Sequence, residues 1–398
     1  MPTSKIVPKI PIGFLRISPK AKRFVNQVLD SNRLSYGPFT RRFESLFASL
    51  HHCRFAVASA SGTTALQIAL GALKETRRWK DNDEVLVPAT TFIATPNSVV
   101  FNRLKPVFVE IEPLYYGMDP KKIEKKITPR TRAVLPVHLF GQTADMKPIL
   151  AIAEKKKLEV VEDSAQTMLA RTDGRYAGSF GAIGCFSTYM AHLLTTGIGG
   201  INTTQDPELA VILRSLINHG RDSIYLNIDD DDKAGPRKLK TIVEKRFSFV
   251  RLGQSARLTE MESAIGVAQL EDELEKNIKK RRENAARLTQ LLSPLDDQVQ
   301  LPTIRPGSEH SFMVYPLILK KQPKRKLVEF LEQNGVETRD LMPLMNQPVY
   351  KKMFPQKGRD YPVSRWLMES GFYMPCHPGL SQENLEFIAS LIRRFFKR

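Results

Sequence analysis

Three segments of this 398-residue chain carry residue types and spacings that could do chemistry. The first is a loop of small residues at 59–65, which includes Gly62 and Thr63 and lies between two apolar runs, 55–58 and 65–73. A small-residue loop that opens a helix leaves backbone amides without partners, and such amides bind phosphate. Ser, Gly and Thr also cap helices where no ligand is present. The loop therefore predicts either a phosphate site or an ordinary helix cap.

The second segment places a carboxylate directly after an apolar run. Residues 158–161 predict a strand, and Asp163 and Gln166 follow it within the sequence EDSAQ. Ligands of open α/β sheets bind at the carboxyl ends of strands, so a carboxylate here is well placed to be functional. Asp163 could hold a cationic ring nitrogen, which would let a pyridinium cofactor act as an electron sink. Helix capping by Asp163 is the alternative.

The third segment is centred on His192. Residues 185–200 read CFSTYMAHLLTTGIGG, and there is no lysine between Val161 and Asp230. An imidazole has an unperturbed pKa of about 6.5, which makes it a competent general base near neutral pH. It cannot form the covalent imine that a lysine forms with an aldehyde. His192 therefore predicts proton transfer without a covalent anchor.

The elements that must position these residues follow an α/β pattern. Apolar, β-branched runs at 84–88, 106–109, 133–137 and 158–161 alternate with helical stretches such as 144–157, which predicts a mostly parallel sheet covered on both faces. Residues 258–284 predict a long helical run, 312–319 a strand, and 326–334 and 382–396 two further helices. We expect a large α/β domain with an N-terminal arm over residues 1–290 and a smaller C-terminal α+β domain over 291–398.

Composition limits the partners. Lys and Arg number 60 against 42 Asp and Glu, a net charge of +18 that attracts anions, although a solvated basic surface explains it equally simply. No zinc, homeodomain or RNA-binding aromatic pattern accompanies these charges, so we expect no nucleic-acid partner. The three cysteines have no metal-ligand spacing, and the acidic run 229–232 favours a surface loop, so no metal site is predicted. No signal peptide or membrane span is predicted, and we expect a cytoplasmic protein.

Short motifs run in a familiar order along nearly the whole chain. They are residues 34–38 (LSYGP), 60–63 (ASGT), 88–95 (PATTFIAT), 137–142 (VHLFGQ), 162–166 (EDSAQ) and 371–378 (GFYMPCHP). Together they resemble the DegT/DnrJ/EryC1/StrS family of sugar aminotransferases. The resemblance implies the fold of type I pyridoxal phosphate (PLP)-dependent transferases, with a seven-stranded-type sheet. It also implies a homodimer in which each partner completes the other's site.

The resemblance also implies roles for individual residues. Gly62 and Thr63 would bind the cofactor phosphate through backbone amides with help from Ser187, Phe92 would stack on the pyridine ring, Asp163 would pair with the ring nitrogen, and Gln166 would contact the ring hydroxyl. The chain departs from the family where His192 replaces the PLP lysine, where Ser255 replaces an asparagine that reaches the phosphate from the partner chain, and where Ile198 replaces a glutamate. The candidates for substrate contact are His310, Tyr315 and Arg339.

His192 thus predicts noncovalent PLP or pyridoxamine phosphate (PMP). Residues 189–192 (YMAH) are similar to the Tyr-Pro-Ala-His segment of the family's sugar 3-dehydratases, which act on nucleotide-linked 4-keto-6-deoxyhexoses. In that reaction PMP condenses with the C4 ketone, the histidine removes a proton and the C3 hydroxyl leaves; glutamate or a reductase partner then restores the cofactor. Leu193 and Ile198 depart from the dehydratases. The alternatives are a sugar aminotransferase of unusual mechanism and a catalytically silent relative that binds a nucleotide sugar.

Overall fold

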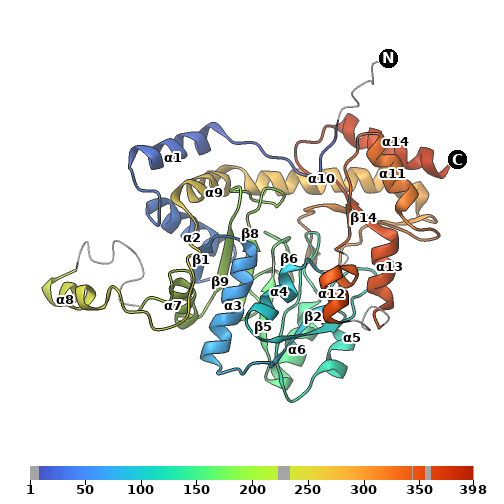
Figure 1. Cartoon of the computed structure of the whole chain (residues 1–398). Helices are drawn as coiled ribbons and strands as arrows, with labels where there is room; N and C mark the ends of the chain where they lie inside the picture. The colour runs from blue at the N-terminus through green and yellow to red at the C-terminus, as the bar shows by residue number, and fades with distance from the viewer. Residues whose placement is uncertain (1–8, 223–233, 343, 355–359, 398) are drawn as a thin grey trace.

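The large part of the molecule is built around a seven-stranded sheet (Figure 1). The computed structural model describes residues 9–222, 234–342, 344–354 and 360–397. The sheet has the order β1-β9-β8-β5-β4-β2-β3. Its strands are β1 (Phe55–Ser59), β2 (Glu84–Pro88), β3 (Lys105–Val109), β4 (Thr131–Val134), β5 (Glu159–Asp163), β8 (Ile183–Ser187) and β9 (Gly200–Thr204). All neighbouring pairs are parallel except those of β9 with β8 and with β1, which confirms the predicted mostly parallel α/β sheet.

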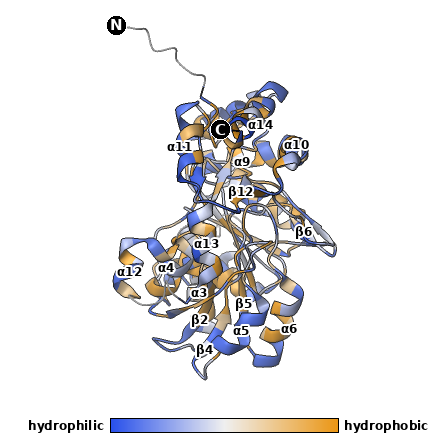
Figure 2. Ribbon diagram, turned by 90° about the vertical axis from the view of Figure 1, so that its right-hand side faces the viewer, coloured by the Kyte–Doolittle hydropathy of each residue, from blue (hydrophilic) through white to orange (hydrophobic). Residues whose placement is uncertain are grey.

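Helices cover both faces of this sheet, which explains why its strands are apolar throughout. Alternate residues of β2 show the two sides: Val85 and Val87 belong to one hydrophobic core and Leu86 to another. The first core includes residues from α2 (Pro38–Leu50), α3 (Gly62–Thr76), α4 (Ala94–Phe101) and α7 (Pro207–Leu216), and the second from α5 (Pro120–Ile123) and α6 (Met146–Lys156). Figure 2 shows the apolar residues gathered on the strands and on the helix faces that pack against them. A strand buried on both sides needs no polar alternation.

A smaller antiparallel sheet has the order β10-β12-β14-β13 and packs with the C-terminal helices. Its elements are β10 (Val299–Gln300), β12 (Tyr315–Leu319), β13 (Arg339–Asp340), β14 (Gly371–Met374), α11 (Arg325–Gln333) and α14 (Gln382–Phe396). The second half of α10 (Leu274–Leu292) belongs to this core, whereas α12 (Pro348–Met353) and α13 (Pro362–Ser370) place Tyr350, Tyr361 and Leu367 in the core of the large sheet. Because the cores share segments on both sides of residue 290, the domain boundary there stays a prediction.

The remaining elements lie outside the two main sheets and the helices named above. They are α1 (Pro19–Asp30), α8 (Pro236–Lys245), α9 (Glu260–Asp272), the three-stranded sheet of β6 (Arg171–Thr172), β7 (Arg175–Tyr176) and β11 (Ser308–Glu309), and the 3₁₀ turns η1 (Glu124–Lys126), η2 (Ser293–Leu295) and η3 (Leu344–Asn346). Within the described residues no helix is both long and apolar enough to cross a membrane. The same residues contain no group of three or more His, Cys, Asp or Glu that could hold a metal ion.

Two local expectations differ from the structure, and a third cannot be compared with it. The helical run 258–284 is two helices, α9 and α10, because the chain breaks at Glu273. The strand expected from residue 312 starts at Tyr315, since Phe312 has a φ of 46°, outside the extended region. The acidic run 229–232 lies outside the described residues, and the charged stretch after it forms α8, which projects from the body (Figure 1).

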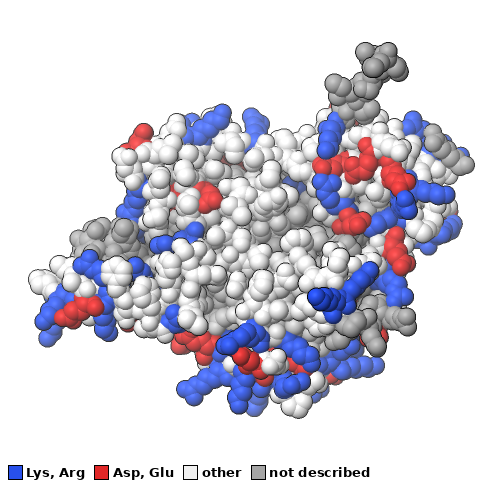
Figure 3. Space-filling view, in the orientation of Figure 1, with Lys and Arg blue, Asp and Glu red and all other residues white. Residues whose placement is uncertain are grey.

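Basic residues gather on α8 and along the lower edge of the face in Figure 3, while the middle of that face carries few charges.

Candidate active site

The phosphate loop is built as its sequence predicts. Ser61 caps α3, and its hydroxyl accepts a hydrogen bond from the amide of Thr64 at 3.1 Å. The amides of Gly62 and Thr63 have no partner among the described residues. A Cβ on Gly62 would lie 2.7 Å from the Cβ of Ser187, so only glycine fits here, and the last residue of β8 packs directly against the loop. Two free amides and a hydroxyl therefore lie together at a helix N-terminus, an arrangement that fits a phosphate.

Asp163 ends the neighbouring strand β5 and is buried. One carboxylate oxygen accepts from the Thr95 hydroxyl at 2.7 Å, and the other accepts from the amide of Ala165 at 3.2 Å. Burial raises the pKa of Asp163, and these two hydrogen bonds oppose the rise only in part. A cationic ring nitrogen beside the carboxylate would stabilise its charged form. The site therefore fits a pyridinium cofactor.

The two other expected cofactor contacts lie in loops at the same edge of the sheet. Phe92, between β2 and α4, leaves 59% of its surface exposed, which is a large free aromatic face for stacking. Gln166 is buried, and its carbonyl oxygen accepts from the amide of Phe140 at 2.9 Å. Its amide nitrogen makes no hydrogen bond within the described part of the chain, so a donor remains for a ligand oxygen.

A buried hydrogen-bond network of His138 and Glu162 supports this edge of the sheet. His138 Nδ1 accepts from the amide of Ala144 at 3.0 Å, so Nε2 carries the proton and donates to Glu162 at 2.9 Å. Glu162 also accepts from the amides of Gly178 and Gly181 at 2.7 and 2.6 Å. Both ring nitrogens of His138 are used, so this histidine orders the loop that follows β4.

His192 lies in the turn after β8, and that turn is held by its own backbone. The amide of His192 donates to the carbonyl of Tyr189 at 2.9 Å, and Tyr189 pairs with Gly197 across the turn. Burial lowers the pKa of His192 to about 4; an interaction with the backbone of Ala165 opposes this shift, and the charge of Arg281 adds to it. Its Nδ1 is buried and has no partner among the described residues. At neutral pH His192 is thus a neutral imidazole, close to the segment that carries Asp163.

His192 also lines an open cleft of about 540 Å³, which we call the arm cleft. The N-terminal arm forms one wall and the junction of α9 and α10 the other; the lining residues are Phe14, Arg16, Ser18, Pro19, Lys20, Arg23, His192, Leu193, Thr195, Gln269, Asp272, Glu273, Lys276, Asn277, Arg281 and Pro378. The arm passes close to the turn that carries His192, since a Cβ on Gly13 would lie 4.0 Å from the Cα of Ala191. The cleft therefore gives a ligand access to His192 from solvent.

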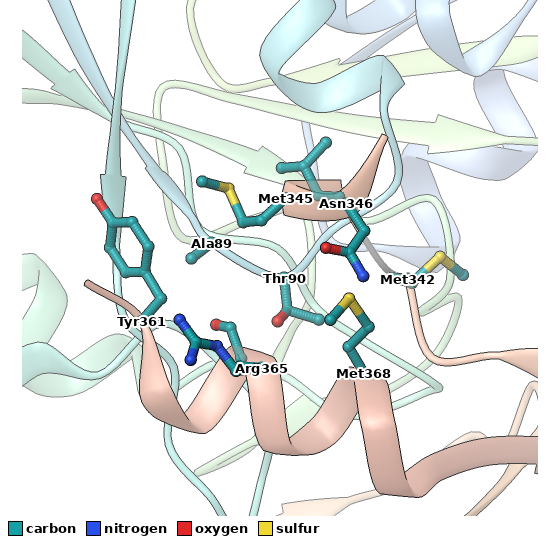
Figure 4. A pocket seen from close by; sticks show the side chains of 10 residues that line it. Ala89, Thr90, Met342, Met345, Asn346, Tyr361, Arg365 and Met368 are labelled. Carbon is teal, nitrogen blue, oxygen red and sulfur yellow. The ribbon is translucent and has the colours of Figure 1, made fainter. Parts of the chain in front are cut away.

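A second cavity lies between α13 and the end of β2 (Figure 4). Met342, Met345 and Met368 surround Thr90 there, and the space measures about 30 Å³. That volume holds about one water molecule and no sugar. We assign it no ligand.

Ser255 lies beside the phosphate loop of its own chain. The carbonyl of Ala256 accepts from the amide of Ala60 at 2.7 Å, which pins this segment next to the end of β1. The Ser255 side chain is exposed, and its oxygen accepts from the guanidinium of Arg257 at 3.4 Å. Its expected role toward a cofactor on the partner chain stays a prediction.

The three substrate candidates are not brought together. His310 is buried, stacks on Phe312 at 3.8 Å and accepts a hydrogen bond from that residue's amide; burial lowers its pKa to about 3. Tyr315 is fully buried in the core of the small sheet, where its hydroxyl pairs with Thr289 at 2.8 Å. This burial argues against direct substrate contact by either residue. Arg339 is exposed and pairs with Glu337, so its role stays open.

Sequence reasoning missed Arg281, which contacts the same cleft as His192. It stands in the basic run 279–282, which reads as a solvated surface, yet only 4% of it is exposed. A usable signal was the helical spacing of Ile278, Ala285 and Leu288, which puts Arg281 on their buried face.

The fold is that of the aminotransferase-like, PLP-dependent enzymes. A sequence profile of the DegT/DnrJ/EryC1/StrS aminotransferase family matches residues 16–393, and the chain belongs to that family.

Similar proteins carry names from nucleotide-sugar metabolism. The chain is 30% identical to a GDP-perosamine synthase of Caulobacter vibrioides over 97% of its own length and 98% of that protein's. It is 35% identical to a UDP-N-acetyl-3-dehydro-alpha-D-glucosamine 3-aminotransferase of Acidithiobacillus ferrooxidans, over 93% and 92%. Among solved structures, S. venezuelae DesV superposes with a TM-score of 0.87 at 30% identity, covering 98% and 99% of the two chains. A histidine-to-asparagine mutant of GDP-4-keto-6-deoxymannose-3-dehydratase (ColD) with bound GDP-perosamine gives 0.85 at 26% identity, covering 96% and 99%.

Proposed function

We propose that this chain is a lysine-less enzyme of nucleotide-sugar metabolism that dehydrates a nucleotide-linked 4-keto-6-deoxy sugar, with His192 as the general base. One observation carries the proposal. An unpartnered, neutral imidazole stands at the place where the family resemblance expects the PLP lysine, and the rest of the cofactor cradle is kept. A histidine there can move protons and cannot anchor the cofactor. PLP or PMP is therefore held noncovalently.

The cradle residues have defined tasks in this proposal. Gly62, Thr63 and Ser187 bind the cofactor phosphate, Asp163 keeps the ring nitrogen protonated, and Phe92 stacks on the ring while Gln166 donates to the ring hydroxyl. The bound cofactor supplies an electron sink that acidifies a neighbouring C–H bond. His192, whose ring is neutral at neutral pH, takes that proton.

The similar proteins support the substrate class. ColD is a 3-dehydratase whose structure was solved as a histidine mutant with GDP-perosamine, and a related structure holds a trapped PLP-glutamate adduct. We accordingly propose glutamate as the source of the amine and of the two electrons that reduce the C3 carbon. A reductase partner is the alternative source of these electrons. We place the reaction in the cytoplasm.

A sugar aminotransferase of unusual mechanism is the second candidate, and the names of several relatives favour it. The synthase and 3-aminotransferase relatives are 30% and 35% identical to the chain. Their names describe transfer of an amine rather than loss of a hydroxyl. The two reactions give products of different composition, because the dehydratase removes one oxygen from the sugar and the aminotransferase replaces the ketone with an amine.

We further propose that two copies form the working enzyme. Leu252 is 98% exposed and Phe101 is 61% exposed, and both line one open groove that leads to Gln254, next to Ser255. Apolar side chains this exposed mark an interaction surface. A second copy seated there would bring Ser255 and Arg257 to its partner's phosphate loop. Leu252→Glu should then shift the protein from dimer to monomer in light scattering; an unchanged mass would contradict this interface.

The function is tested by incubating the protein with PMP, glutamate and a nucleotide-linked 4-keto-6-deoxyhexose. We expect mass spectrometry to show a sugar product that lacks one oxygen atom. Borohydride treatment of the PLP-loaded protein should leave the protein mass unchanged. An amino sugar product would establish the aminotransferase instead, and a borohydride-stable adduct on a lysine would refute the lysine-less reading. Sugar binding without turnover would identify a silent relative.

A further inference from the structure

The arm cleft carries an excess of positive charge. Five basic side chains line it, namely Arg16, Lys20, Arg23, Lys276 and Arg281, against the two carboxylates Asp272 and Glu273. Lys20 is neutralised by Glu271 and Asp272 at 2.9 and 2.8 Å. The other four basic residues have no ion pair among the described residues. Asp272, which interacts with Lys276 and Arg23, and Glu273 offset part of this charge, and a net positive charge remains in the cleft.

Arg281 is the most unusual of these cations because it is buried. Its Nη1 donates to the carbonyls of Phe312 and Met313 at 3.4 and 2.6 Å, and its Nε is buried without a partner. Burial lowers the pKa of Arg281 to about 10, which leaves the guanidinium charged at neutral pH. A buried cation without an anionic partner is costly, so an anion in the cleft would stabilise it.

The N-termini of two helices, which are the positive ends of the helix dipoles, border this cleft. Ser18 and Pro19 at the start of α1, and Glu273 at the start of the 19-residue α10, all line it. No side chain caps α10. Helix N-termini attract anions through their free amides and dipoles. The helix ends and the buried Arg281 therefore both favour an anionic ligand in the cleft that His192 also lines.

We propose that the arm cleft is an anion subsite that binds the diphosphate of the nucleotide-linked substrate and thereby holds its sugar against His192. The proposal rests on the function proposed above. The diphosphate is attached to C1 of the sugar, so it lies about one ring's width from the C3 and C4 atoms where the reaction takes place. A cation-lined cleft that contains His192 is therefore at the right reach. Arg16 and Arg23 would contact the diphosphate from the arm side and Lys276 and Arg281 from α10.

The test is calorimetric titration of the full-length, PMP-saturated protein with inorganic pyrophosphate and with GDP. PMP saturation keeps pyrophosphate out of the cofactor phosphate site. We expect Lys276→Ala and Arg23→Ala each to weaken binding by about fivefold, the loss of one partly exposed charged contact. Lys279→Ala is the matched control, because it removes the same charge from the same helix at an exposed residue outside the cleft. It should change binding less than twofold.

Equal effects of Lys276→Ala and Lys279→Ala would overturn the subsite, since they would show a general charge effect. Pyrophosphate and GDP that bind with wild-type affinity to both Lys276→Ala and Arg23→Ala would overturn it as well. If Lys276→Ala weakens the binding of glutamate but leaves the binding of pyrophosphate unchanged, the diphosphate is refuted as the ligand of the cleft. The His192→Asn variant tests the proposed function separately from the subsite. Turnover that survives in that variant contradicts the catalytic role of His192. The comparison of Lys276→Ala with Lys279→Ala measures only pyrophosphate and GDP affinity, so its outcome does not depend on turnover.

Discussion

Replacing His192 with asparagine tests the proposed mechanism most directly. Asparagine has a similar size and keeps polar atoms in the turn, but it cannot accept a proton at neutral pH. The buried Nδ1 of His192 makes no hydrogen bond within the described residues, so its loss leaves no protein group there unsatisfied. We therefore expect the variant to fold and to bind cofactor, and to lose the proton-transfer step.

The expected loss follows from the state of the imidazole. With a pKa of about 4, only about one His192 in a thousand is protonated at pH 7, so nearly every molecule carries an active base. A low pKa also makes the base weaker, and general-base catalysis contributes about 10²- to 10⁴-fold. We expect a loss at the lower end of that range, about 100- to 1000-fold in kcat, which corresponds to about 3–4 kcal/mol in the activation free energy.

The assay is single-turnover dehydration with PMP-loaded protein, which excludes cofactor regeneration from the measured rate. His52→Asn is the matched control, because His52 is exposed and its φ of 53° suits asparagine. That variant should retain wild-type turnover. A His192→Asn enzyme that keeps more than a tenth of the wild-type rate would refute the assignment of His192 as the base.

Three further predictions follow from the same site. Asp163→Asn cannot balance a cationic ring nitrogen, so we expect at least tenfold weaker cofactor retention in equilibrium dialysis; unchanged retention would contradict that pairing. Gly62→Ala forces a Cβ to within 2.7 Å of Ser187 and should lower the free energy of unfolding by about 1–3 kcal/mol in urea, whereas Gly235→Ala, with no atom within 4 Å, should change it by less than about 0.5 kcal/mol. The folded pKa of His192 is about 4 and its usual value is 6.5, so the unfolded chain takes up the proton first and His192 should lower folding stability as the pH falls from 6.5 toward 4. The free energy of unfolding of the wild type relative to that of His192→Asn should therefore drop between pH 7 and pH 5. A constant difference would show that the pKa is not lowered.

Local sequence patterns were sufficient for much of the fold. The predicted strand 84–88 and helix 382–396 coincide with β2 and α14. A strand buried on both faces must be a short continuous apolar run, and an amphipathic helix must repeat its apolar residues every three to four positions, so both are visible in the sequence. Breaks are less visible. The interruption at Glu273 follows no proline or glycine, which is why α9 and α10 looked like one helix.

Motif order also predicts the cofactor cradle. The loop at Gly62, the carboxylate of Asp163 and the hydroxyl of Ser187 stand at the ends of strands that the sequence itself predicts, and parallel strands bring their carboxyl ends to one edge. The substrate candidates had no such constraint. The family resemblance suggests His310 and Tyr315 only because the small domain closes over the substrate side, and only the tertiary packing shows that both are buried.

By itself, the sequence determined the class of fold and the family, and it predicted the cofactor cradle and the replacement of a lysine by His192. The tertiary structure alone decided what surrounds that histidine. Residues about 180 and 90 positions away in the chain, Gly13 and Arg281, lie beside its turn or line its cleft. Burial and the nearby charge that lower its pKa come from these long-range contacts. Local patterns encode which face of an element is apolar, and they do not encode which distant segment will cover it.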